Sequence, residues 1–160
     1  MTDSFRRAVG RKVVSRSSAG DVGAVSHFLV DAGNRRIAAI VVGRGKKARL
    51  IDWADVSGFG PDAVMVGDEA ALRPPLDDRE RAAADGKLDM VGKRALTERG
   101  SELGTVDDVT FDPGSGTVDA LQIGDREVPA GSLLGSGPYA VVLAASEEPA
   151  RSNDRSTPAE

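Results

Sequence analysis

The chain alternates short apolar runs with turn residues over most of its length. Runs rich in Val, Ile, Leu and Phe are separated by Gly, Asp, Asn and Pro, which is the pattern of short antiparallel strands. Tight hairpin turns, which need residues that tolerate a positive φ, are expected at Asp31–Asn34 and Asp112–Gly116. The pattern predicts strands at residues 11–15, 22–31, 36–43, 48–52, 63–67, 93–97, 103–112, 117–124, 126–128 and 139–144.

The pattern occurs twice in the same order, because residues 10–68 align with residues 92–145. Length differences fall in Gly-, Ser- and charge-rich segments, where turns tolerate them. We interpret the chain as two copies of one β-rich unit, called repeat one and repeat two below. The best-matched segments pair Gly20–Val25 with Gly100–Val106, Ile37–Gly43 with Val118–Gly124, Leu50–Asp52 with Glu127–Pro129, and Gly60–Val66 with Gly137–Leu143.

Strand parity predicts a β-bulge at the same place in each repeat. A regular strand turns every second residue to one face, so Val106 and Val109 cannot share a face without an extra residue between them. Val25 and Phe28 break parity at the equivalent place. We therefore expect β-bulges, which bend strands as a small closed barrel requires, at Ser26–His27 and Asp107–Asp108.

A short helix is predicted between the repeats. Arg73-Pro-Pro75 ends the first sheet, and Asp77–Ala84 has strong helix formers with acidic residues first and Gly86 just after it. Residues 146–160 are rich in Pro, Ser, Asn and charge, have no apolar anchor, and are predicted to be disordered. The expected organisation is a first domain at 9–72, a linker with a short helix at 73–89, a second domain at 90–145 and a tail at 146–160.

Composition limits the chemistry available to the chain. It has no cysteine, and His27 is its only histidine, so thiolate nucleophiles, disulfides, His-based triads and zinc sites are excluded or nearly so. No apolar run approaches the ~20 residues that span a bilayer, and residues 1–10 have no signal-peptide core. We expect a cytoplasmic protein without transmembrane segment, cofactor, metal site or enzymatic activity.

The net charge of −4 is unevenly distributed. Residues 1–76 carry 12 Lys/Arg and 8 Asp/Glu, whereas residues 77–160 carry 9 and 17. The two halves can therefore attract one another, or a second copy of the chain head to tail. The acidic balance disfavours a nucleic acid as partner of the whole protein.

The repeated Gly and apolar positions resemble those of the PRC-barrel family. Repeat one has Gly10, Gly20-x-x-Gly23-x-Val25, an apolar strand closing on Asp31, a strand ending in Val42-Gly43, and Ile51-Asp-x-x-x-Val56; repeat two has Leu103–Val109, Asp112 and Val128-Pro129. The resemblance covers about residues 9–67 and 90–144.

This resemblance implies an all-β fold of two small antiparallel PRC-type β-barrels in tandem, joined by a short helical linker. Such barrels occur in the cytoplasmic part of the photosynthetic reaction centre H subunit and in the ribosome maturation factor family. The family shares a fold rather than a chemistry, so the resemblance supplies no catalytic or ligand residues.

Two surfaces of repeat one are candidate binding sites. In the alignment Leu29 meets Thr110, Val41 meets Gln122 and Trp53 meets Ala130, so repeat one is apolar where repeat two is polar or small. Clustered exposed apolar groups mark contact surfaces, although the linker helix or repeat two can also cover them. A candidate anion-binding patch, interpreted otherwise as a solvated hairpin surface, comprises Arg35, Arg36, Arg44, Lys46, Lys47 and Arg49.

These observations favour a non-catalytic protein-interaction or assembly module with a protein partner or a second copy of itself. The homodimer would form through Leu29, Val41 and Trp53 of repeat one. The alternative is an RNA- or ribosome-associated factor that uses the basic hairpins, but these lack the interleaved aromatic residues on which RNA bases stack.

Overall fold

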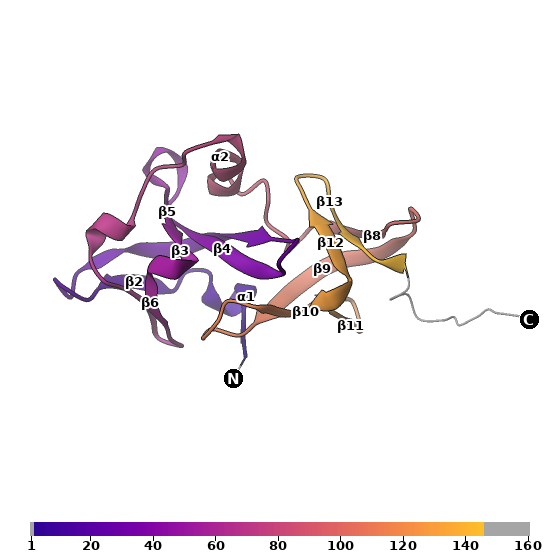
Figure 1. The fold of residues 1–160 in the computed structure, drawn as a ribbon, viewed down its shortest axis with the longest axis horizontal. Coiled ribbons are helices and arrows are strands. Elements are labelled where there is room, and N and C mark those ends of the chain that lie inside the picture. Colours follow the sequence, from indigo (N-terminus) through magenta and orange to yellow (C-terminus); the bar gives the residue numbers. More distant parts are fainter. Residues whose placement is uncertain (1, 146–160) are drawn as a thin grey trace, which may run out of the picture.

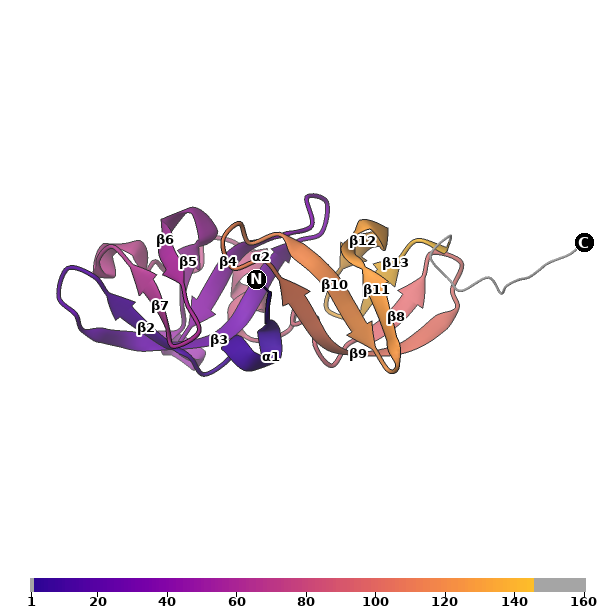
Figure 2. The ribbon, with the colours of Figure 1, turned by 90° about the horizontal axis from the view of Figure 1, so that it is seen from below.

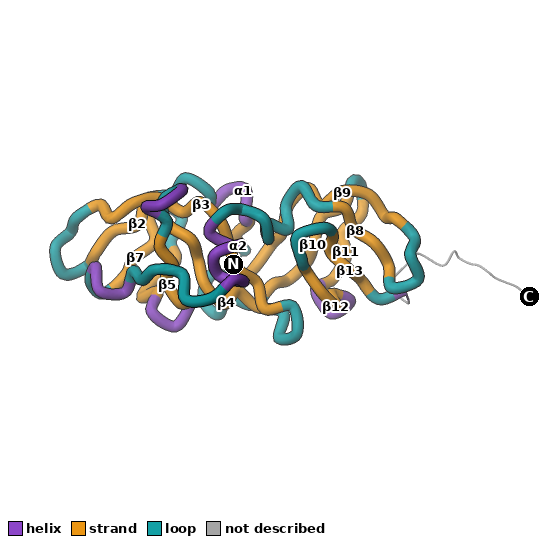
Figure 3. Tube along the Cα trace, turned by 90° about the horizontal axis from the view of Figure 1, so that it is seen from above, coloured by secondary structure: helices purple, strands orange, loops and turns teal. Residues whose placement is uncertain are grey.

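The computed structural model describes residues 2–145, and the predicted disordered tail at 146–160 lies outside this range. Two β-sheets lie side by side along the long axis of the molecule, one from each repeat (Figure 1; Figure 2, seen from below). Strand and loop dominate both ends, and the longer helix lies above the first sheet near the middle (Figure 3).

Repeat one forms a six-stranded sheet, and its strands follow the predicted apolar runs closely. Short 3-10 turns interrupt its connections: η1 (Gly45–Lys47), η2 (Trp53–Asp55) and η3 (Glu69–Ala71). In spatial order the strands are β5 (Arg49–Asp52), β4 (Arg36–Val42), β3 (Asp21–Asp31), β2 (Lys12–Ser15), β7 (Ala63–Val66) and β6 (Val56–Phe59).

Repeat two has the same topology, with η4 (Ala130–Ser132) in the place of η2. A further short strand, β1 (Asp3–Ser4), comes from the start of the chain and pairs with Thr110 and Phe111 of this sheet, off its main strand order. The order of the other strands is β11 (Arg126–Pro129), β10 (Val118–Ile123), β9 (Glu102–Phe111), β8 (Arg94–Thr97), β13 (Ala140–Leu143) and β12 (Leu133–Ser136).

Two helices precede the two sheets. The short α1 (Phe5–Ala8) begins at Ser4, whose hydroxyl accepts a hydrogen bond from the Arg7 N–H. The predicted linker helix is α2 (Asp78–Ala84), and it begins at Asp77, whose carboxylate accepts a hydrogen bond from the Glu80 N–H. The helix ends just before Gly86, whose φ of 81° stops it.

The bulge prediction is confirmed in both repeats. The β3–β4 register shifts between Val25 and His27, and the β9–β10 register shifts between Val106 and Asp108. Each shift leaves one residue unpaired, which keeps the apolar residues before and after it on the core side.

Two expectations about the sheets need correction. In each repeat the first and last strands pair in parallel, namely β2 with β7 and β8 with β13. The other strands of the repeat lie between them in the sequence, so this pair is not joined by a hairpin. Each strand ladder also ends in two edge strands, β5 and β6 or β11 and β12, so the described residues do not confirm a closed barrel. Both β6 and β12 were missed because each is a short, Gly-containing segment.

One apolar core crosses from the first sheet to the second. It includes side chains from every strand of repeat one and continues through Met90 into repeat two as far as Leu143. A second, smaller core lies between α2 and the outer face of the first sheet. Because β4 separates the two cores, its Ile40 and Val42 lie in the first and its Ala39 and Val41 in the second, which explains the unbroken apolar run.

Candidate functional site

The hairpin turns of the two repeats pair with one another across a local two-fold axis. The Ile37 N–H donates to the Gly116 carbonyl at 2.8 Å, and the Val118 N–H donates to the Arg35 carbonyl at 2.9 Å. Ile37 is the equivalent of Val118, and Arg35 of Gly116, so exchanging the repeats maps each bond onto the other. At this bridge the repeats therefore meet through equivalent residues, as in an isologous contact.

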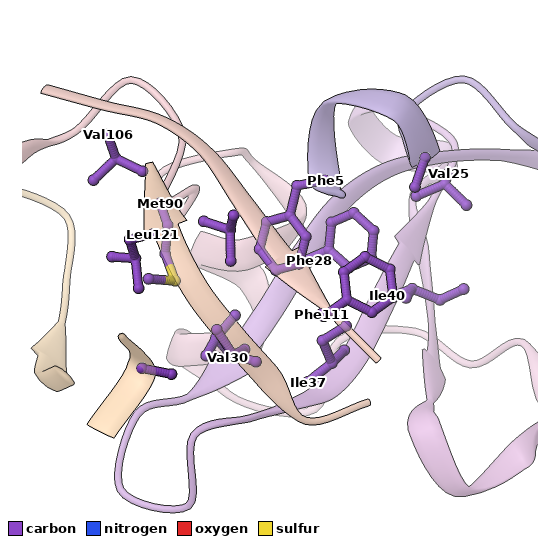
Figure 4. Close-up of a cluster of buried hydrophobic side chains, with 14 of the residues drawn as sticks. Phe5, Val25, Phe28, Val30, Ile37, Ile40, Met90, Val106, Phe111 and Leu121 are labelled. Atoms are coloured by element: carbon purple, nitrogen blue, oxygen red, sulfur yellow. The ribbon is translucent and has the colours of Figure 1, made fainter. Parts of the chain in front are cut away.

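Five of the six aromatic side chains gather at this junction. Phe111 of β9 lies 5.5 Å from Phe5, 5.8 Å from Phe28 and 5.4 Å from Phe59, measured between ring centroids. Phe5 and Phe28 stack at 4.1 Å, and Trp53 meets Phe111 edge-on at 6.4 Å. Figure 4 shows Phe5, Phe28 and Phe111 in contact, with Met90 and Leu121 continuing the core into repeat two. The junction is thus an apolar core, not an electrostatic contact.

The start of the chain fastens the repeats together. Its β1 pairs with β9 of repeat two, while the Asp3 carboxylate receives a 2.7 Å hydrogen bond from Arg11, just before β2 of repeat one. The same Arg11 Nη1 also donates to the Gly60 carbonyl at 2.9 Å. Burial alone would raise the pKa of Asp3, but the hydrogen bonds from Arg11 and from the Ser4 N–H, with the nearby cations, outweigh it and lower that pKa.

The structure corrects the prediction that Leu29 and Val41 face a partner. Both are buried under α2, against Ala83 and Ala84. The outer face of repeat one is apolar because the linker helix covers it, and the equivalent face of repeat two carries Thr110 and Gln122. The sequence left open that the linker helix covers these residues, and this cover accounts for the difference in polarity between the outer faces of the two repeats.

Trp53 serves the junction rather than an outer surface. Its half-buried ring packs 5.5 Å from Phe59 and lies against Gly116 of repeat two. Gly116 has a φ of 78°, and a Cβ there would come within 2.6 Å of the indole. Trp53, predicted as an interface residue, therefore makes its contacts within the chain.

An ion-pair network holds α2 on the sheet. Arg73 donates at 2.7 Å to Asp52, at the end of β5, and at 2.8 Å to Glu80 of the helix. The Arg73 backbone also exchanges two hydrogen bonds with Leu50, so Arg73 covers the outer edge of β5. The hydrogen bonds to Glu80 and then Asp52 raise the pKa of Arg73, and the Arg73 hydrogen bond lowers the pKa of Glu80.

The six basic residues do not form one patch. Arg35 lies just before β4 and Arg36 is its first residue, and both lie beside repeat two, where Arg36 donates to the Ser115 carbonyl at 3.3 Å. Arg44 lies at the other end of β4, ~20 Å away at ~3.3 Å per strand residue. The prediction of a single basic patch is therefore wrong, because the two turns lie at opposite ends of β4. The second group, at this far turn and the start of β5, comprises Arg44, Lys46, Lys47 and Arg49.

A cavity of about 440 Å³ opens beside the junction. It lies between α1, the β3 bulge, the β4–β5 turn and the segment before β8, and His27 is in its wall. His27 Nδ1 lies 2.9 Å from the Asp89 carboxylate, and its ring also packs against Gly86. As predicted, His27 occupies the bulge, where it ties repeat one to the segment that leads into repeat two.

Among residues 2–145, four large apolar side chains are exposed. They are Val9, which lines this cavity, and Leu76, Leu134 and Tyr139, which do not. Tyr139 is 69% exposed in the turn between β12 and β13, and its hydroxyl receives a 2.7 Å hydrogen bond from Arg94, whose guanidinium also lies over the ring. Repeat one has Asp62 at the equivalent position, so this aromatic group is particular to repeat two.

Sequence reasoning missed Phe5, Asp3 and Asp89. All three lie outside the aligned repeats, in segments too short for a periodic pattern. The one available signal was that Phe5, Ala8 and Val9 are apolar at helical spacing in a chain with only four phenylalanines.

Between residues 2 and 145, no three His, Asp or Glu side chains are grouped so as to hold a metal ion. In the same range, no helix has the length and apolar character needed to cross a membrane.

Topology and junction together define a tandem β protein whose two units of identical strand order share one core. The chain belongs to the PRC-barrel family: the family model of the PRC-barrel domain matches residues 2–70 and again residues 88–144. This confirms the tandem resemblance found in the sequence, and the first match also takes in β1 and α1. No curated protein matches the chain.

Proposed function

We propose that the chain is a non-catalytic protein-interaction or assembly module. PRC-barrel domains commonly have this role. The observation that carries the proposal is the shared aromatic core, which fixes the two PRC units in one orientation and so presents two sheets to partners at a set spacing. A preorganised surface loses less entropy on binding than two units on a flexible linker.

The contact surface of this module is the Tyr139 turn of repeat two. Tyrosine and arginine are enriched among residues that dominate binding energies, and here Arg94 holds the Tyr139 ring in place. Leu134, 48% exposed on the edge strand β12, adds an apolar group to the same hairpin. A homodimer through Leu29 and Val41 is not part of the proposal, because α2 covers both.

The test compares the wild type with Tyr139→Asp, which gives repeat two the residue that repeat one has at this turn. Leu76→Ser is the matched control, since it removes an exposed apolar side chain from the linker. Each protein is used as bait in a lysate of its native host, and its solution mass is measured by light scattering. Captured proteins are then remade in pure form and titrated against all three baits.

Support requires a purified partner, or a second copy of the chain, that binds the wild type and Leu76→Ser alike and binds Tyr139→Asp at least tenfold more weakly. If no purified protein binds and the wild type stays monomeric, the proposed function is wrong. If a partner binds all three baits equally, the module stands but its surface is not the Tyr139 turn.

A further inference from the structure

The cavity beside the junction has the lining of a small-molecule site. Its floor is formed by Phe5, Phe28 and Met90, and Val9 and Val91 extend the apolar surface. Its volume of about 440 Å³ falls within the ~300–1,000 Å³ usual for ligand pockets, which are mostly apolar with a few polar groups. Val9 is 43% exposed although it lies beside this buried cluster, so the apolar surface reaches the opening.

Cations without carboxylate partners line the same cavity. Within residues 2–145, the Arg44 side chain makes no hydrogen bond or ion pair, and the Arg6 guanidinium donates a hydrogen bond only to the backbone carbonyl of Asp107. The one acid in the lining, Asp89, already pairs with His27 through both carboxylate oxygens, at 3.0 and 2.9 Å. Arg6 and Arg44 therefore line a mostly apolar cavity whose one carboxylate is engaged.

We propose that this junction pocket binds a small amphipathic carboxylate. The apolar body of the ligand packs on Phe5, Phe28 and Met90, and its carboxylate pairs with Arg44, with Arg6 as the second cation. A planar guanidinium suits a carboxylate because it offers two parallel N–H donors. A single negative charge fits better than a dianion, since Asp89 lies in the same lining. This site is separate from the Tyr139 turn and does not depend on the proposed function.

Octanoate is the probe, and octylammonium is its matched control, because it has the same apolar body with the opposite charge. Binding of each to the full chain is measured by calorimetry, and the site is located by amide chemical-shift changes. Arg44→Gln removes the unpaired cation. Lys47→Gln removes an exposed cation of the same turn that does not line the pocket. Far-UV circular dichroism verifies that both variants keep the fold.

The proposal expects octanoate to bind the wild type, with shift changes centred on Val9, His27 and Val91, and octylammonium to bind at least tenfold more weakly. Arg44→Gln should weaken octanoate binding about three- to tenfold, and Lys47→Gln less than twofold. Absence of octanoate binding at millimolar concentration, equal binding of octylammonium, or shift changes elsewhere would each overturn the proposal. Tyr139→Asp should bind octanoate like the wild type, so the two proposals fail separately.

Discussion

Replacing Phe111 by alanine tests whether the two repeats share one core. Its fully buried ring belongs to repeat two but lies within 6 Å of three phenylalanines on the side of repeat one. A buried Phe→Ala change costs about 3–5 kcal/mol, because burial is lost and a cavity remains, and the lost aromatic pairs place Phe111 at the upper end of that range. With a urea m-value of about 2 kcal/mol/M, the unfolding midpoint should fall by about 2 M.

Trp53 gives the assay a probe of the junction. It is the only tryptophan, it belongs to repeat one and its ring lies against Gly116 and Phe111 of repeat two, so its fluorescence reports on the repeat-one side of the junction, whereas far-UV circular dichroism reports on both sheets. One shared core predicts that the two urea midpoints coincide in the wild type and fall together in Phe111→Ala.

The sharper variant is Leu143→Ala, because Leu143 is fully buried in β13, a strand that pairs with no strand of the first sheet. We expect the Trp53 midpoint to fall by about 1–2 M in this variant as well. A Trp53 transition that stays at the wild-type midpoint, while circular dichroism shows two separate steps, would refute the single core.

Three further predictions concern the junction and the linker helix. Gly116→Ala should lower the free energy of unfolding by about 2–4 kcal/mol, because the residue has a positive φ and its new Cβ would meet the indole. Gly100→Ala, where φ is 87° and the space is open, should lower it by about 1 kcal/mol, and chemical denaturation measures both changes. Replacing α2 by a Gly-Ser linker of equal length should cause association in light scattering, and adding Leu29→Thr with Val41→Gln, the residues of repeat two, should restore the wild-type mass. Because the folded-state pKa of Glu80 is lowered, its stabilising effect is present above ~4.3, the pKa in the unfolded chain, and is lost as pH falls through the folded value. The difference in urea midpoint between the wild type and Glu80→Gln should therefore shrink between pH 5 and pH 3.

The features that could be predicted are those determined by neighbouring residues. The bulge at Ser26 follows from parity within one strand, and the start of α2 follows from Asp77 and the residues after it. The tandem fold followed from comparing the two repeats, since an apolar position is more informative when it recurs in the same order.

The features that could not be predicted depend on contacts distant in the sequence. Leu29 and Val41 have the composition of a binding surface, and only the position of α2 shows that the chain itself covers them. Likewise, β1 is two residues long, and nothing in Asp3 or Ser4 indicates a partner strand more than a hundred residues away. Arg35 and Arg44 are close in the sequence, but β4 lies between them and places them at opposite ends of the strand.

The local two-fold axis explains why the repeats diverge where they do. Near the axis the two repeats meet through the bridge between Arg36 and Thr117, and the equivalent residues next to it, Ile37 and Val118, are both apolar and buried. Away from the axis each repeat is free to change: one outer face became apolar under α2, while the other carries Thr110 and Gln122. The junction pocket follows the same rule, because Phe28 and the bulge are shared in type by both repeats, whereas Arg44 has Asp125 as its equivalent. A carboxylate in repeat two therefore stands where the junction pocket has the cation of Arg44.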